Sequence, residues 1–173
     1  MKLQVLMFYQ DDPKKCTAAK MVKFGLAQFY LMTSNINKAN VVLQQIIDES
    51  DNQNDVLSAT VILAENFLKS KNIDKANDLV IDVLEQEPNY SDALLVKSKI
   101  SLIKGESDEA INSLRVILKD KPDNVDAAIL LSKAHRSNGD KGLAEEVLRL
   151  ASTYNNTDAD LQLEYSRMLA ETG

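Results

Sequence analysis

The chain has 173 residues, of which 45% are hydrophobic and 27% charged, with only 5 glycines and 3 prolines. This composition is typical of one mostly helical domain, because glycine and proline are unfavourable inside helices. The net charge of −6 argues against nucleic-acid binding, which needs a basic surface, and the single cysteine, Cys16, excludes an internal disulfide bond.

The chain opens on an apolar stretch, residues 3–9, which is too short for a membrane span of roughly 18–20 apolar residues. No other stretch approaches that length, so membrane insertion is not expected. The compartment stays open, because a lone cysteine is compatible with the cytoplasm and does not exclude the periplasm.

Asp12 and Pro13 predict the start of a helix, because aspartate is a common N-cap and proline is tolerated in the first turn. We interpret residues 1–19 as an N-terminal helical segment, either a cap or the end of a preceding repeat of the kind that follows. The chain stops at Gly173, where a helix is expected to end. Both ends leave open whether the chain is a piece of a longer protein.

From residue 20 onward, small residues, glycines and prolines recur with a spacing of 34 residues. The recurring positions are Gly105, Gly139 and Gly173; Ala76, Ala110 and Ala144; and Pro88 and Pro122. The spacing divides the chain into repeats at 20–56, 57–90, 91–124 and 125–158, with a fifth helix or capping helix at 159–173. The first repeat has three extra residues, and we expect its polar stretch 48–56 to loop out.

Each repeat is expected to fold as two helices that pack closely through small residues. Position 8 holds Ala27, Ala64, Ser98, Ser132 and Ser166, and position 20 holds Ala39, Ala76, Ala110 and Ala144. Aliphatic side chains at position 24 (Leu43, Val80, Leu114, Leu148) and position 27 (Ile46, Val83, Ile117) are predicted core residues. Gly105 and Gly139 are expected to close the first helix in a left-handed conformation, with Ser107 and Asp140 capping the second.

This pattern resembles the tetratricopeptide (TPR) repeat, from about Lys20 to the end of the chain. No repeat has the tryptophan often found at position 4, which makes the repeats similar to degenerate bacterial versions. The resemblance implies an all-α fold, a TPR-type α-solenoid in which antiparallel helix pairs form a right-handed superhelix. It also implies a non-enzymatic protein–protein interaction scaffold, with looser similarity to TPR proteins of bacterial envelope and polysaccharide-export systems.

In the TPR fold the first helix of each pair lines a concave groove, to which positions 5 and 9 point. Position 5 holds Phe24, Val61, Leu95, Ile129 and Leu163, and position 9 holds Gln28, Glu65, Lys99, Lys133 and Arg167. The last three form what we call the cation row, which predicts binding of an extended, acidic peptide or protein segment. The alternative is that these are solvated charges, balanced by Asp92, Asp126 and Asp160 at position 2.

No catalytic, cofactor or metal site is indicated by the sequence. Zinc would need three or four closely spaced Cys, His or carboxylate ligands, and a nucleophilic Cys–His pair would need a third group to orient it. The only histidine, His135, takes a position that is aromatic or aliphatic in other repeats, so we expect it to pack between helices.

Three other interpretations stay open. Residues 11–27 resemble the opening of archaeal-type ribosomal-RNA aminocarboxypropyltransferases, although nothing after Ala27 matches the body of that enzyme. The array could also be a structural module that self-associates through the apolar ends of the solenoid. Finally, it could be the regulatory segment of a larger enzyme.

Overall fold

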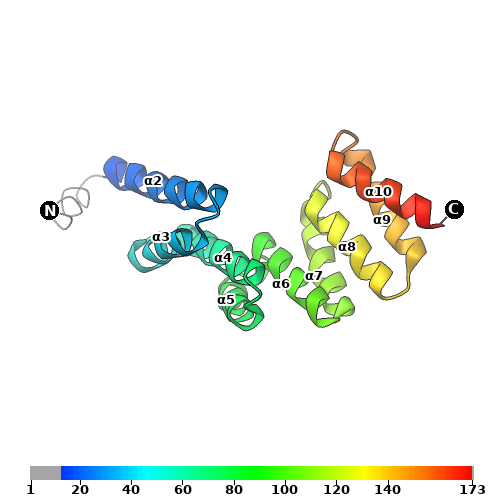
Figure 1. The fold of residues 1–173 in the computed structure, drawn as a ribbon, viewed down its shortest axis with the longest axis horizontal. Helices are drawn as coiled ribbons and strands as arrows, with labels where there is room; N and C mark the ends of the chain where they lie inside the picture. The colour runs from blue at the N-terminus through cyan, green and yellow to red at the C-terminus, as the bar shows by residue number, and fades with distance from the viewer. Residues whose placement is uncertain (1–12, 173) are drawn as a thin grey trace. The chain divides into compact units, whose positions relative to one another are not determined.

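The computed structural model describes residues 13–172, with side chains from 21 to 171, and this part of the chain is entirely helical (Figure 1). Its nine helices are α2 (Pro13–Met32), α3 (Ile36–Glu49), α4 (Gln53–Lys69), α5 (Ile73–Gln86), α6 (Ser91–Lys104), α7 (Ser107–Asp120), α8 (Val125–Ser137), α9 (Lys141–Tyr154) and α10 (Ala159–Thr172). The N-terminal segment expected at 1–19, a cap or the end of a preceding repeat, lies outside the described residues as far as residue 12. Residues 13–19 form the start of α2. Gly173 also lies outside them.

The helices form two compact units, residues 1–79 and 80–173, which divide within α5. In the first unit, α2 packs against α3 and α3 against α4. In the second unit, each of the helices α6 to α9 packs against the helix that follows it, and α8 also contacts both α6 and α10. This succession of paired helices is a TPR-type α-solenoid.

The predicted small residues lie where helices meet. All four alanines at position 20 are completely buried, and Ala27, Ala64, Ser98 and Ser132 at position 8 are buried as well. The aliphatic residues at positions 24 and 27 are also core residues, as predicted. Ser166 differs and is exposed, because it lies on α10, the last described helix.

The two turn glycines have the predicted left-handed conformation, with φ of 80° at Gly105 and 84° at Gly139. Asp140 lies at the predicted N-cap position of α9 but makes no side-chain cap hydrogen bond. The prediction for Ser107 is wrong, because the residue before α7 is Glu106, which makes no side-chain cap hydrogen bond either. The backbone closes these turns instead: the Glu106 amide donates to the Ser101 carbonyl oxygen over 2.8 Å. Ser107 is the buried first residue of α7.

The expected loop at 48–56 is largely helical. Residues 48 and 49 end α3, and α4 begins at Gln53, one turn before Leu57. The Asn52 side chain accepts hydrogen bonds from the amides of Asn54 and Asp55, over 2.9 and 3.3 Å, and so caps this added turn. The three extra residues are therefore accommodated mainly by a longer α4, because a polar sequence with a good N-cap can form a first helical turn.

Candidate functional site

The three residues of the cation row belong to three helices of the second unit. Lys99, Lys133 and Arg167 come from α6, α8 and α10, and α8 contacts the other two helices. The position-5 residues Leu95, Ile129 and Leu163 lie one turn earlier on the same helices, and residues four apart share a helix face. On each of these three helices, the apolar position-5 residue and the basic position-9 residue therefore share a face.

The apolar residues of this face differ in accessibility. Leu95 packs against the cluster centred on α7, and Ile129 packs against the cluster formed by α8, α9 and α10, so both are half-buried. Leu163 is 51% exposed. The apolar surface available to a partner therefore increases toward α10.

The three cations are also unequal. The Arg167 side chain is 63% exposed, and its Nη1 lies 3.6 Å from Oε2 of Glu164 on the same helix. Lys99 is half-buried and interacts with another group of the chain. Lys133 is exposed. Lys133 is therefore the member of the cation row that is most available to an incoming anion.

The remaining predicted groove residues belong to the first unit. Phe24 packs against the cluster formed by α2, α3 and α4, and Val61 is only 6% exposed. Gln28 is exposed, whereas Glu65 is half-buried with its carboxylate 3.8 Å from Lys69 Nζ. Of these four residues, Gln28 alone offers a largely exposed side chain to a partner.

A depression of about 460 Å³ lies beside Lys133 in the second unit. It is lined by Lys133, Arg136, Ser137, Lys141 and Glu171, and we call it the α8–α10 pocket. Arg136 Nη2 donates to both carboxylate oxygens of Glu171 over 2.8 Å. Sequence reasoning did not single out Arg136, on α8, or Lys141, the first residue of α9, because it followed only positions 5 and 9 of each repeat.

A buried carboxylate supports this pocket from α10. Glu164 is 8% exposed, and its Oε1 lies 3.5 Å from Arg136 Nη1 while its Oε2 faces Arg167. Two guanidinium groups thus lie beside one buried carboxylate and offset part of the cost of burying its charge. Arg136 is consequently held between two acids of the neighbouring helix.

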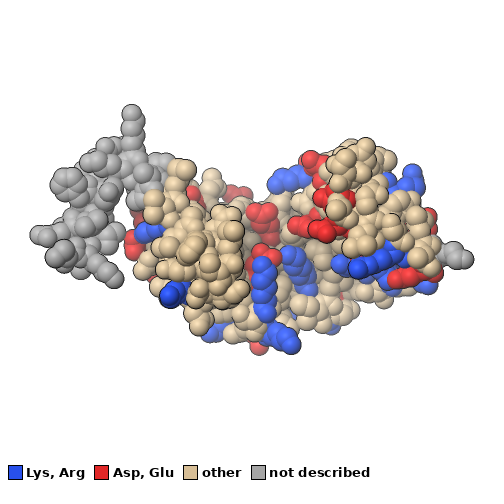
Figure 2. Space-filling model, turned by 45° about the horizontal axis from the view of Figure 1, so that its top comes forward, with Lys and Arg blue, Asp and Glu red and all other residues tan. Residues whose placement is uncertain are grey.

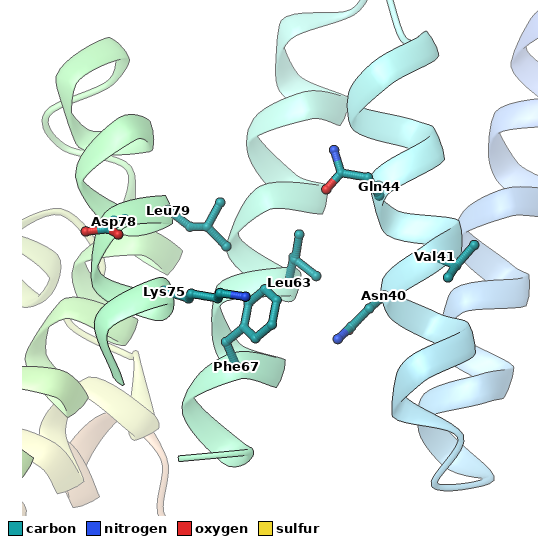
Figure 3. A pocket seen from close by; sticks show the side chains of 8 residues that line it. All are labelled: Asn40, Val41, Gln44, Leu63, Phe67, Lys75, Asp78 and Leu79. Atoms are coloured by element: carbon teal, nitrogen blue, oxygen red, sulfur yellow. The ribbon is translucent and has the colours of Figure 1, made fainter. Parts of the chain in front are cut away.

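The first unit has an apolar pocket of about 390 Å³ between α3 and α5, with α4 as its floor (Figure 3). Its lining residues are Asn40, Val41, Gln44, Leu63, Phe67, Lys75, Asp78 and Leu79. Lys75 Nζ lies over the Phe67 ring, 5.5 Å from its centroid. The pocket is formed mainly by the second helices of two pairs, so it is separate from the predicted groove positions.

Charges of both signs are interspersed over the face seen in Figure 2, where blue and red side chains lie close together. Among residues 13–172, no helix is long and apolar enough to cross the bilayer. Within the described part of the chain, no three His, Cys, Asp or Glu side chains gather closely enough to hold a metal ion. His135, on α8, is buried, with 4% of its surface exposed, as a packing residue would be.

Solved structures similar to this chain are TPR proteins. PilF of Pseudomonas aeruginosa aligns over 90% of this chain and 70% of its own, with a TM-score of 0.76 and 18% identity. TTC0263, a TPR protein of Thermus thermophilus, aligns over 89% and 83%, with a TM-score of 0.75 and 15% identity. MamA of Desulfovibrio magneticus RS-1 aligns over 88% and 85%, with a TM-score of 0.69 and 15% identity. These likenesses establish the TPR fold, which in general serves as a scaffold for protein interactions.

Sequence comparisons add one partial match. Residues 1–34 match the family model described as a possible Fer4-like domain in RNase L inhibitor. Ferredoxin-type clusters are held by four cysteine thiolates, whereas this whole sequence has one cysteine. The described part of the matched segment consists mainly of α2, which packs on α3. No curated protein matches the sequence.

Proposed function

We propose that the chain is a non-enzymatic scaffold that binds an extended, acidic peptide or protein segment on the α6–α8–α10 face of its second unit. The observation that carries the proposal is the alignment of the cation row with the position-5 residues on three adjacent helices. Such a face suits a peptide that alternates carboxylates with apolar residues, since an extended chain advances roughly 3.3 Å per residue. Neighbouring helices are about 8–10 Å apart, which matches a carboxylate at every third residue.

Electrostatic steering also supports an acidic partner. The cation row places three basic side chains on successive first helices of a protein with a net charge of −6, so an acidic segment is attracted to this row and repelled by the rest of the surface. Leu163, which is half exposed, supplies apolar contact area beside Arg167. We infer no catalytic role, in line with the TPR fold and with the burial of the only histidine. Membership of a bacterial envelope or polysaccharide-export assembly is part of this proposal and rests on the resemblance of the repeats alone.

The experiment is affinity capture from an extract of the source organism, followed by titration of the captured partner with the purified chain. The test variant changes Lys99, Lys133 and Arg167 to glutamate. The matched control changes Lys104, Lys119 and Arg149 to glutamate, because these two lysines and one arginine are exposed cations of the same unit.

We expect the cation-row variant to bind the partner about tenfold or more weakly. Each reversed charge repels the acidic partner, which lowers the association rate and weakens the complex. The control variant should bind like the native chain, and both should retain native helical circular dichroism. Equal binding by the two variants would show that the cation-row side chains are solvated charges without a binding role, and would reject the proposal.

Self-association is a second candidate function, favoured by exposed apolar side chains on the outermost described helices. On α2 these are Met21, Val22, Phe29 and Met32, with exposures of 72%, 67%, 57% and 80%; on α10 they are Leu163 and Leu169, with exposures of 51% and 45%. Exposed apolar patches of this kind often mark interaction sites. The partner in this case would be a second copy of the chain.

A further inference from the structure

We propose that the α8–α10 pocket binds a carboxylate side chain of the partner, and that Glu171 occupies the same pocket as an internal competitor. This inference rests on the proposed function and assigns a specific subsite to it. Lys133 belongs both to the cation row and to the pocket, so it connects the two. The ligand is an acidic residue, Asp or Glu, next to an apolar residue that contacts Ile129 one turn earlier on α8.

The pocket has an excess of positive charge. Its lining contains Lys133, Arg136 and Lys141 against one carboxylate, Glu171. Lys133 and Lys141 have no acidic partner among the described residues, whereas both oxygens of Glu171 are bound by Arg136. Two ammonium groups therefore remain to receive a further carboxylate, as point charges with freely rotating donors.

The internal carboxylate shows that this chemistry fits the pocket. Arg136 binds Glu171 through two hydrogen bonds of 2.8 Å, which are charge-assisted and short. Its other terminal nitrogen faces the buried Glu164, which limits the positions that the guanidinium can adopt. A preorganised arginine loses less side-chain freedom when it binds a ligand.

Glu171 is suited to yield to a ligand. Its side chain is 45% exposed and it lies in the last turn of α10, where exposed ion pairs are weak. An incoming carboxylate can take its place on Arg136 or bind beside it on the two lysines. Removing the charge of Glu171 should therefore strengthen binding of an acidic ligand, whereas removing a purely structural contact would not.

An acidic peptide is favoured over a nucleic acid because the pocket is small and local. The protein is acidic overall, and charges of both signs mix on the visible face (Figure 2), so no continuous basic track exists there for a phosphate backbone. A peptide with one carboxylate beside an apolar residue can contact both the lysines of the pocket and the neighbouring position-5 residue, Ile129.

The experiment titrates the full chain into a fluorescein-labelled hexapeptide of alternating leucine and glutamate residues, followed by fluorescence anisotropy at low salt. The variants are Lys141→Glu, Glu171→Gln and, as the matched control, Lys119→Glu, an exposed lysine outside the pocket. Inorganic pyrophosphate is added as a competitor in a separate arm.

We expect Lys141→Glu to weaken peptide binding about tenfold and Glu171→Gln to strengthen it about two- to fivefold, with the control unchanged. The inference is overturned if the native chain does not bind the peptide, if Lys141→Glu matches the control, or if Glu171→Gln fails to strengthen binding. Displacement by equimolar pyrophosphate would also overturn it, since the site would then be a general anion site.

These outcomes separate the subsite from the proposed function. Loss of binding in Lys99→Glu and Arg167→Glu, with Lys141→Glu unaffected, would retain the cation row and reject the pocket. Unchanged partner capture by the cation-row variant would reject the proposed function itself.

Discussion

At the scale of single residues, the most constrained positions are the alanines where paired helices cross. Ala39, Ala76, Ala110 and Ala144 are all 0% exposed, although alanine is small enough to be tolerated almost anywhere on a surface. Their role is to leave space for the opposite helix. Close packing of this kind gives almost no room for additional methylene groups.

Substitution of Ala110 by leucine tests this constraint. The larger side chain would overpack α7, and we expect the free energy of unfolding to fall by about 1–3 kcal/mol, measured by urea denaturation. Asn112→Leu on the exposed side of the same helix is the control and should change it by no more than about 0.5 kcal/mol. Equal effects of the two changes would contradict the packing argument.

At the scale of helices and turns, two glycines have opposite conformational requirements. Gly105 ends α6 with φ of +80°, whereas Gly25 lies inside α2. An added Cβ would meet nothing within 4 Å at either position. The effect of an alanine substitution on stability at each site therefore depends on the backbone conformation and not on contacts of the added methyl group.

Alanine at the two sites should change stability in opposite directions. Gly105→Ala is expected to cost about 1–2 kcal/mol, because an L-residue is strained in the left-handed region. Gly25→Ala is expected to gain up to about 1 kcal/mol, because alanine is the better helix former. Thermal unfolding should detect both as shifts of the midpoint. A loss of stability in Gly25→Ala would show that the α2 surface has a further packing role.

At the scale of the whole molecule, the question is whether the exposed apolar surface of α2 is covered by a second copy. Val22 and Phe29 are 67% and 57% exposed, and burial of such side chains on association is favourable by about 25 cal/mol per Å². Exposed apolar surface of this kind often marks an interaction site.

Sedimentation equilibrium over a wide concentration range tests this candidate. If α2 mediates self-association, the native chain should show a mass above that of the monomer, and the double variant Val22→Glu and Phe29→Glu should remain monomeric. A native chain that stays monomeric throughout would reject self-association. Oligomers of equal mass in both proteins would instead assign the contact to another surface.

The amino-acid sequence by itself was enough to predict the TPR-type fold and the buried small residues. Spacing along the chain was sufficient, because a helix places residues three or four apart on one face and a glycine of fixed position ends it. The buried alanines and the left-handed Gly105 and Gly139 follow from these local rules. The resemblance to TPR repeats rested on the same spacing, and the fold is of that type.

Only the tertiary structure decided which charges meet and which groove positions are accessible. Arg136 meets Glu164 and Glu171, which lie 28 and 35 residues later, and Lys141 reaches the same pocket from α9. Val61 is buried although it holds the same repeat position as the exposed Leu163. The physical reason is that side-chain pairing and exposure depend on the neighbouring helices, whereas the repeat pattern specifies only the position of each residue on its own helix.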